Sequence, residues 1–333
     1  MIQHIPEQFR DDALRIVEAL KTLDKFIVSA HVNPDGDAVA SLVAAGHVLR
    51  ALGKEFVLYS STGLPNYLAF VELPGIVRTN ISPLPFTPQA GFFLDCNRAD
   101  RMGKDMEQLA PTLPSVNVDH HEGDHGLGTA AQWIVPEAAA TAQLMCYVAM
   151  AAGLPLEGKL GDGLMVGLIT DTGGFRHANT SVEVLELVTL LLKNGVNLSA
   201  IRANIENCWS IDRFRLWAEL FGRMQMFCDD QLAVCAVRLK DLQKHHMLKE
   251  DLEGFVEYMR RLRGVKVTLM LREDAPNYWK ISMRSSGNVD VEQVAARFGG
   301  GGHRNAAGGN IGKPEQEAVA DLVSAIQPAL ITE

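Results

Sequence analysis

Residues 115–121 read Ser115-Val116-Asn117-Val118-Asp119-His120-His121, an apolar segment that runs directly into one acid and two imidazoles. A short buried strand of this kind delivers polar side chains to its carboxyl end, where open α/β sheets place their functional sites. A single Asp-His-His tripeptide has little value alone. It becomes informative because other apolar segments of the chain end in the same way.

Three further apolar segments run into acids or histidines. Residues 25–30 precede His31-Val32-Asn33-Pro34-Asp35-Gly36-Asp37, residues 91–94 precede Asp95, and residues 164–170 precede Asp171. We expect strands in the first two and a helix in the third. The Asn-Pro and Asp-Gly pairs predict a tight turn, with Asp37 as the cap of a helix that continues to about residue 52.

Strands that alternate with helices at this spacing predict an α/β fold with a doubly wound, mostly parallel sheet. We expect three parts: an N-terminal catalytic domain at residues 1–190, a helical connector at 191–228, and a smaller C-terminal α/β domain at 229–333. In the last part, residues 232–237, 266–271 and 278–284 read as strands, and residues 314–330 read as an amphipathic helix. The length of 333 residues and the 47% hydrophobic content suffice for two cores.

Composition narrows the class of protein. A formal charge of −9 and a pI near 5.6 argue against a surface that grips long nucleic acid, but they allow a small anionic ligand. No apolar run approaches the roughly 20 residues of a membrane span, and the N-terminus lacks the apolar core of a signal peptide. Five scattered cysteines are typical of reduced thiols. We therefore expect a cytoplasmic protein without membrane association.

The polar residues at the ends of these segments are candidate metal ligands. Any single acid among them could be a helix cap or a turn residue, but four segments that end alike favour one shared site. Several carboxylates in one crevice would repel each other and protonate unless cations neutralised them. The candidates are His31, Asp35, Asp37, Asp95, Asp119, His120, His121 and Asp171.

Mixed carboxylate and imidazole ligation favours Mn²⁺, Fe²⁺, Co²⁺ or Zn²⁺ over Mg²⁺, which prefers oxygen ligands. We expect two divalent ions, Mn²⁺ in the first place, with Mg²⁺ or Co²⁺ as alternatives. Two such ions about 4 Å apart can acidify a bridging water and stabilise both oxygens of an in-line displacement at phosphorus. The natural reaction is hydrolysis of a phosphate ester.

Together these segments resemble the four motifs of the DHH phosphoesterase superfamily. The C-terminal Gly299-Gly300-Gly301-Gly302-His303 with Ala306-Ala307-Gly308 is similar to the associated DHHA1 substrate domain. Within that superfamily, the size and domain pair most resemble the NrnA-like oligoribonucleases, which also dephosphorylate 3′-phosphoadenosine 5′-phosphate. The resemblance covers nearly the whole chain.

The resemblance implies a role for each motif residue. One metal would be held by His31, Asp35 and Asp95, and Asp95 would bridge to the second. The remaining ligands of the second metal would be Asp37, His120 and Asp171. The catalytic residues would be Asp95, His121, which would face the scissile phosphate, and Asp119, which would orient an imidazole or touch a metal.

The glycine segment has a physical use of its own. Glycines lack side chains, so their backbone N–H groups can approach a phosphate or a base closely. Arg284 ends a predicted strand and can grip a phosphate through its guanidinium. In the family pattern the Arg-Ser pair faces the substrate. The predicted substrate contacts are Arg284, Ser285, Gly300, Gly301, Gly302 and His303.

We therefore predict a two-metal phosphoesterase for short RNA or a 3′,5′-bisphosphate nucleotide, and the resemblance implies a homodimer. Alternatives within the superfamily are a phosphodiesterase for cyclic or linear dinucleotides, an inorganic pyrophosphatase and a RecJ-like exonuclease. From another class, a nucleotide sensor without turnover could keep the same pocket. The run Arg260-Arg261-x-Arg263 is more typical of a solvated helix end than of a nucleic-acid patch. Spacing leaves open whether four residues beside the motifs contact substrate or form local pairs: Arg98, Arg101, Arg176 and His177.

Overall fold

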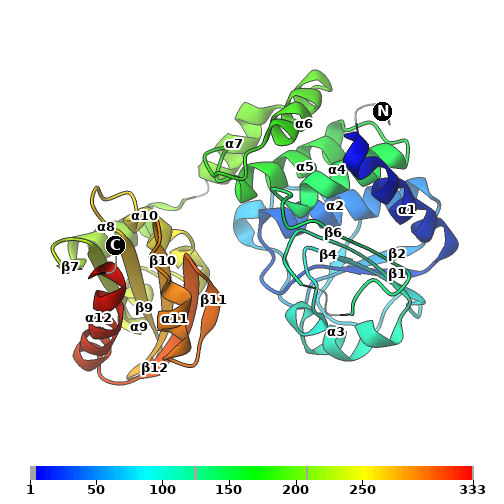
Figure 1. Cartoon of the computed structure of the whole chain (residues 1–333). Helices are drawn as coiled ribbons and strands as arrows, with labels where there is room; N and C mark the ends of the chain where they lie inside the picture. The colour runs from blue at the N-terminus through cyan, green and yellow to red at the C-terminus, as the bar shows by residue number, and fades with distance from the viewer. Residues whose placement is uncertain (1–4, 124–125, 208, 332–333) are drawn as a thin grey trace. The chain divides into compact units, whose positions relative to one another are not determined.

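The computed structural model describes residues 5–123, 126–207 and 209–331 of the chain. It divides into two compact units, residues 1–208 and 209–333, and each unit is considered by itself (Figure 1). The residues of the expected connector, 191–228, are shared between the two units, and the three-part division stays a prediction. Four cysteines are free thiols, and Cys208 lies outside the described residues.

The first unit alternates strands and helices along the chain, as expected. Its elements are α1 (Glu7–Thr22), β1 (Phe26–Ser29), α2 (Gly36–Ala51), β2 (Phe56–Tyr59), η2 (Asn66–Leu68), β3 (Val77–Arg78), β4 (Ala90–Leu94), η3 (Ala99–Met102), α3 (Lys104–Leu109), η4 (Ala110–Thr112), β5 (Ser115–Asp119), β6 (Ala131–Ile134), α4 (Thr141–Ala151), α5 (Gly158–Asp171), α6 (Val182–Lys193) and α7 (Leu198–Glu206).

The first sheet has the strand order β3-β2-β1-β4-β5-β6, and all its pairings are parallel. From β1 the chain adds β2 and then β3 on one side of the sheet. It then crosses to the other side of β1 and adds β4, β5 and β6 there. The carboxyl ends of β1 and β4 therefore form the point where the strand order reverses. In open α/β sheets this switch point is where ligands bind.

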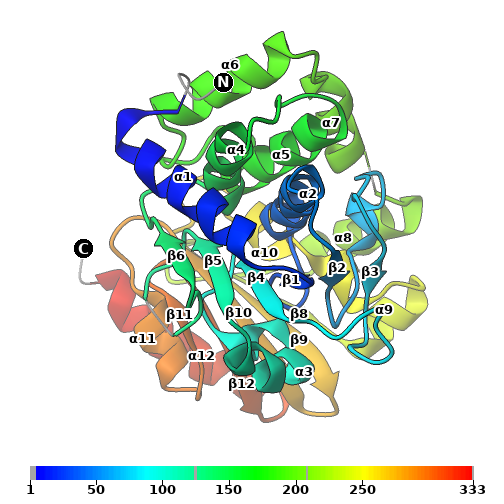
Figure 2. The same ribbon diagram turned by 90° about the vertical axis from the view of Figure 1, so that its right-hand side faces the viewer.

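Helices cover both faces of this sheet, which confirms the predicted doubly wound fold. Phe26 and Val28 pack against the core of α1, α2, α4 and α5, whereas the alternate residue Ile27 packs on the other face with Met106 of α3. This alternation follows from the two-residue period of a strand. Figures 1 and 2 show α1, α2, α4 and α5 on one side of the strands and α3 on the other.

Helix α2 is buried around almost its whole circumference, as its Ala- and Val-rich sequence predicts. Helix α5 approaches it closely at Gly167, where a Cβ would lie 2.8 Å from the Cβ of Ala40 and 2.5 Å from that of Ala142. A side chain at Gly167 would force α5 away from α2 and α4. Asp171 lies one turn further along α5, so this close packing brings its carboxylate to the switch point.

The second unit also has a six-stranded sheet, with the order β11-β12-β10-β9-β8-β7, in which β8 and β9 are parallel and the other pairings are antiparallel. Its elements are α8 (Ile211–Gly222), β7 (Gln225–Phe227), β8 (Leu232–Val237), α9 (Leu239–Lys244), η5 (Lys249–Leu252), α10 (Phe255–Met259), β9 (Val267–Ala275), β10 (Tyr278–Ser285), α11 (Val291–Ala296), β11 (Gly301–His303), β12 (Ala306–Gly312) and α12 (Glu315–Ile331).

Alternate residues of β10 again face different layers. Ile281 and Met283 pack with α11 and α12, while the opposite face of the sheet packs with α8, α9 and α10. The predicted strand pair joined at Pro276-Asn277 is the β9–β10 hairpin. The second unit is thus the smaller α/β domain that the sequence predicted.

Among the described residues, no single helix has both the length and the apolar character to cross a membrane. Helices α6 and α7 satisfy that test only as a pair, and the chain bends by 109° between them.

Candidate metal centre

The polar ends of four separate segments meet at the switch point of the first sheet. His31 follows β1, Asp95 follows β4 directly, Asp119 is the last residue of β5, and Asp171 is the last residue of α5. Parallel strands carry their carboxyl ends to the same edge of a sheet, which is why segments far apart in the sequence converge. The structure brings together all eight residues that the sequence singled out.

Asp95 lies at the centre of the cluster and is 1% exposed. Its Oδ2 is 3.4 Å from Nε2 of His31, and its Oδ1 is 3.5 Å from Nε2 of His120. The two oxygens therefore face two different imidazoles. Its backbone φ of +53° is left-handed, a conformation that aspartate adopts more readily than most residues and that often marks a functional position.

Two groups of ligand atoms adjoin Asp95. In the first, Nε2 of His31 is 3.8 Å from Oδ1 of Asp35. In the second, Nε2 of His120 is 3.7 Å from Oδ2 of Asp37 and 3.4 Å from Oδ2 of Asp171. Each group, completed in the first case by Asp95, is compact enough for one ion. These separations are close to what two bonds of about 2.1 Å span around a metal.

Hydrogen bonds to backbone carbonyls fix the orientation of two imidazoles. Nδ1 of His31 lies 2.9 Å from the carbonyl oxygen of Val32, and Nδ1 of His120 lies 3.2 Å from that of Ala138. A carbonyl can only accept, so each Nδ1 donates its proton. When each ring is neutral, as a metal ligand must be, its lone pair is on Nε2, which faces the carboxylates. Metal-binding histidines are commonly held in this way.

His121 is held differently. Its Nδ1 lies 2.8 Å from Oδ1 of the fully buried Asp119, which also accepts the backbone N–H of His121 at 3.1 Å. The same Nδ1 is 3.5 Å from Oδ1 of Asp95, a longer separation. Because Asp119 takes up Nδ1, the nitrogen that remains for a ligand or substrate is Nε2.

Asp37 does not cap α2, so that expectation was wrong. The cap is Asp35, which accepts hydrogen bonds from the backbone N–H groups of Asp37 and Ala38 at 3.1 Å. Asp37 instead accepts from the first turn of α4, namely from the N–H groups of Thr141 and Ala142 at 2.7 Å each. A buried carboxylate at a helix N-terminus is stabilised by these donors and by the helix dipole.

Sequence reasoning missed Thr141. This fully buried residue donates its hydroxyl hydrogen bond to Oδ1 of Asp95 at 3.0 Å, in addition to its backbone contact with Asp37. Asn179, also missed, donates to the carbonyls of Ala139 and Asp171 at 3.1 and 3.2 Å. Both residues join the start of α4 to the cluster and so hold its carboxylates in place.

The charges in the cluster are not balanced by the histidines alone. Burial and the neighbouring Asp95 raise the pKa of Asp171 to about 8. Burial, followed by repulsion from Asp95 and Asp171, raises the pKa of Asp37 well above its usual range. Burial opposes ionisation of Asp95 as well, but hydrogen bonding from His31 and the charge of His120 lower its pKa. Its two carboxyl neighbours overcome the effect of burial on His31 and raise its pKa to about 10.

The donor set therefore fits divalent metal ions. Two imidazole nitrogens and four carboxylates point inward, and without cations two of the acids are held in conditions that favour protonation. Divalent ions would replace those protons and neutralise the excess negative charge. The cluster can hold divalent metal.

The predicted substrate contacts in the second unit divide into exposed and buried residues. Arg284 is half-buried at the end of β10, and burial lowers its pKa. Ser285 is buried, and its hydroxyl donates to the carbonyl of Val289 at 2.7 Å and accepts from Asn305 at 2.8 Å. In the structure this hydroxyl therefore holds the loop after β10.

The predicted glycine segment forms the edge strand β11 and the residues directly before it. Gly301, Gly302 and His303 are exposed. A Cβ at Gly300 would lie 1.9 Å from the carbonyl oxygen of Gly308, and one at Gly302 would lie 2.5 Å from that of Ala306. These two glycines are thus required for the pairing of β11 with β12. A Cβ at Gly301 would meet nothing within 4 Å.

Three of the four residues left open beside the motifs make local side-chain contacts. Arg98 pairs with Asp100 at 2.9 Å, Nε of Arg176 donates to the carbonyl of Gly173 at 2.7 Å, and Nδ1 of His177 lies 3.3 Å from the carbonyl of Asp171. For Arg101, it is the backbone carbonyl that accepts, from the N–H of Val32 at 2.7 Å.

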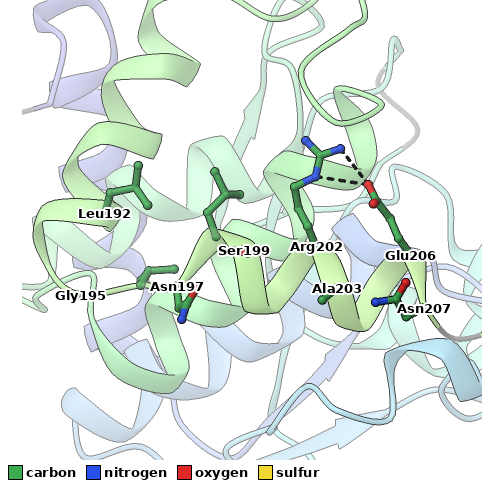
Figure 3. Close-up of a pocket in the computed structure, with 10 residues that line it drawn as sticks. Leu192, Gly195, Asn197, Ser199, Arg202, Ala203, Glu206 and Asn207 are labelled. Carbon is green, nitrogen blue, oxygen red and sulfur yellow. Dashed lines mark hydrogen bonds and ion pairs between the residues drawn. The ribbon is translucent and has the colours of Figure 1, made fainter.

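An open pocket of about 870 Å³ lies elsewhere on the first unit, along the end of α6 and the length of α7 (Figure 3). Arg202 and Glu206 in this pocket form an ion pair at 2.8 Å. Among the described residues that line it there is no predicted site residue and no cluster of metal ligands. The candidate metal ligands lie instead in the carboxylate–imidazole cluster at the switch point.

Comparisons with known proteins agree with the two-domain fold. The DHH family N-terminal domain matches residues 25–168, and the DHHA1 domain matches residues 229–331. The bifunctional oligoribonuclease and PAP phosphatase NrnA of Thermus thermophilus is 30% identical over 98% of this chain and 97% of that protein. The protein of the same name from Mycoplasma genitalium is 25% identical over 92% of this chain and 94% of its own length.

Among solved structures, an exopolyphosphatase-related protein from Bacteroides fragilis is similar with a TM-score of 0.89 and 26% identity. The match covers 97% of this chain and 98% of that one. A parallel sheet with a carboxylate–imidazole cluster at its switch point, followed by a mixed-sheet domain, defines the class as a two-domain metal-dependent phosphoesterase. The chain belongs to the DHH family, and it carries a DHHA1 domain after the DHH domain. Its curated relatives over the full length include proteins named NrnA.

Proposed function

We propose that this protein binds two divalent metal ions, Mn²⁺ by preference, and hydrolyses short oligoribonucleotides and 3′-phosphoadenosine 5′-phosphate. The observation that carries the proposal is the position of Asp95. Its two oxygens face separate groups of ligands, His31 with Asp35 on one side and His120 with Asp37 and Asp171 on the other. A carboxylate in that position can bridge two ions. The names of the NrnA relatives support the substrate class.

Metals held there would acidify a water molecule and stabilise negative charge on the phosphoryl oxygens. The chain itself would supply positioning. Thr141 and the first turn of α4 fix Asp95 and Asp37, and carbonyl contacts orient His31 and His120. His121 is fixed through Nδ1 by Asp119, so its Nε2 would donate to a phosphoryl or leaving oxygen.

In the second unit, Arg284, His303 and the exposed Gly301 would bind a part of the nucleotide that is not hydrolysed. Ser285 would act by holding the loop after β10 unless its hydroxyl is released on binding. The homodimer, the cytoplasmic location and the exclusion of long nucleic acid remain predictions.

The test is a parallel assay in Mn²⁺ on 3′-phosphoadenosine 5′-phosphate, di- to pentanucleotides, cyclic dinucleotides and pyrophosphate. We expect turnover of the bisphosphate and of the shortest RNAs, and loss of that turnover in Asp95→Ala. Asp100→Ala is a matched control, since Asp100 is an exposed acid that pairs with Arg98 on the same loop. Full activity of Asp95→Ala on a dinucleotide would refute the bridging role, and a preference for pyrophosphate would refute the substrate class.

A further inference from the structure

Arg284 lies on the sheet face that packs against α10. It pairs across the sheet with Thr268 of β9, whose hydroxyl donates to the carbonyl of Val256 in α10 at 3.0 Å. Directly paired residues of neighbouring strands project to the same face. The guanidinium of Arg284 therefore projects on the α10 side of the second sheet.

Glu257 of α10 lies between two arginines. Its Oε1 is 2.7 Å from Nη1 of Arg260, and its Oε2 is 3.7 Å from Nε of Arg284. Nε of Arg260 is buried and has no hydrogen-bond partner among the described residues. Arg284 otherwise donates to the carbonyl of its own neighbour, Met283. Two guanidinium groups thus share one carboxylate. Not all of their N–H groups have a hydrogen-bond acceptor among the described residues.

The same face carries the exposed end of β11. Arg284 pairs with Ala306 of β12, and Ala306 pairs with His303 of β11. His303 is therefore two strands from Arg284 in one row, roughly 10 Å away. Ala306 lies between them, and its small side chain does not obstruct a ligand that reaches both residues. A nucleotide held by His303 could place a phosphate at the arginine pair.

We propose that Glu257 determines the charge of the phosphate that binds at Arg284 and Arg260. It acts as an internal carboxylate that competes with the ligand, so the site accepts a singly charged phosphodiester more readily than a doubly charged terminal phosphate. This inference rests on the proposed function, because it concerns a phosphate of the same substrates that is not hydrolysed. Glu257 lies outside the DHH and DHHA1 motifs.

Charge balance explains the preference. The two arginines and Glu257 together carry one net positive charge, which a phosphodiester neutralises. A terminal phosphate carries nearly two negative charges above its second pKa of about 6, and it would leave the site negative. Without the carboxylate, two positive charges would match the terminal phosphate. Specificity of this kind comes from an unfavourable element as much as from favourable contacts.

The experiment measures binding of two probes to the metal-free full-length protein at pH 8 by calorimetry. Adenosine 5′-monophosphate carries the terminal phosphate, and its phosphate monomethyl ester carries a single charge. We expect Glu257→Gln to tighten binding of the monophosphate about tenfold and that of the ester less than threefold. Arg260→Ala should weaken the monophosphate more than the ester.

Glu292→Gln is the control, since Glu292 is an exposed acid of α11 that packs on the opposite face of the same unit, and its loss makes the same change in net charge. Circular dichroism checks that each variant folds. Equal effects of Glu257→Gln and Glu292→Gln on both probes would overturn the proposal, as would a wild-type protein that binds neither probe. The separate Mn²⁺ hydrolysis assay on wild-type protein shows whether the proposed function itself has failed.

Discussion

The buried carboxylate of Asp119 holds His121 through two hydrogen bonds, one from Nδ1 at 2.8 Å and one from the backbone N–H at 3.1 Å. The two residues are almost adjacent in sequence, yet they have different positions relative to the metal cluster. Asp119 is fully buried, and its Oδ2 has no hydrogen-bond partner among the described residues. The imidazole is therefore the main partner of a buried charge, and its orientation is strongly fixed.

We expect Asp119→Asn to lower kcat about 10- to 100-fold with little change in bound metal. The amide oxygen can still accept both hydrogen bonds, so the ring stays in place but loses the adjacent negative charge. Steady-state kinetics and metal analysis by mass spectrometry give the two readouts. His120→Gln is the comparison, because it should remove metal as well as activity. Loss of metal in Asp119→Asn to the same extent would show that Asp119 is a ligand.

Removal of the Thr141 hydroxyl should weaken metal binding about tenfold. Thr141→Val keeps the shape of the side chain and the backbone donor to Asp37, but Asp95 loses its hydrogen bond. The measurement is a titration of metal-free protein with Mn²⁺. Thr189→Val on the exposed face of α6 is the control, since that hydroxyl bonds only to its own helix. Equal affinities for the two variants would contradict the positioning role of Thr141.

Metal uptake should depend on pH. In the metal-free protein the pKa of Asp171 is raised to about 8 and that of His31 to about 10. Both groups hold protons at pH 7 that must leave before they can bind a cation. The affinity for Mn²⁺ should therefore rise with pH from 6 through 8, up to about tenfold per unit for each proton released.

Calorimetric titrations in two buffers of different ionisation enthalpy count those protons directly. Asp171→Asn cannot release a proton and should give a shallower pH dependence, although its binding is weaker at every pH. Affinity that stays constant between pH 6 and 8 would show that the carboxylates are already ionised in the metal-free cluster.

The sequence predicted the polar cluster because its logic is topological. Apolar segments that end in Asp95, Asp119 and His31 read as parallel strands, and parallel strands bring their carboxyl ends to one edge. No side-chain geometry was needed for these conclusions.

The sequence could not show that Asp35, and not Asp37, caps α2. Both acids lie within reach of the first turn of α2, and either spacing is compatible with a cap. The choice depends on where α4 begins, and α4 offers Asp37 backbone N–H groups, which leave no mark in a sequence. Thr141 was missed for the same reason, since a threonine at the start of a helix is common. The buried hydroxyl of Ser285 likewise depends on the path of the following loop.

Stability of the second unit should depend on Asp241, which is 3% exposed and accepts two hydrogen bonds from Arg223 and one from the N–H of Arg238. Burial would raise its pKa, but the Arg223 guanidinium and that N–H lower it. Asp241→Asn should cost about 2 kcal/mol at pH 7. A carboxylate whose pKa is lowered on folding stabilises the fold above its unfolded pKa near 4, and this stabilisation is lost as the pH falls through the lowered pKa of the folded state. The free energies of unfolding of wild type and variant should therefore converge as the pH falls below about 4. Urea unfolding followed by tryptophan fluorescence measures this, and a constant difference would contradict it.

Gly301 offers a test of ligand approach that leaves the fold intact. A Cβ there would meet no protein atom within 4 Å, so Gly301→Ala should unfold at the same urea concentration as wild type. If a nucleotide lies against this strand, the added methyl group displaces it, and KM should rise on the order of tenfold with little change in kcat. Gly300→Ala is the contrasting variant, since its Cβ would lie 1.9 Å from the carbonyl oxygen of Gly308 and should destabilise β11 and β12 directly. An unchanged KM in a folded Gly301→Ala protein would show that the substrate does not lie against β11. Arg284 and His303 would then not bind the substrate across the glycine segment.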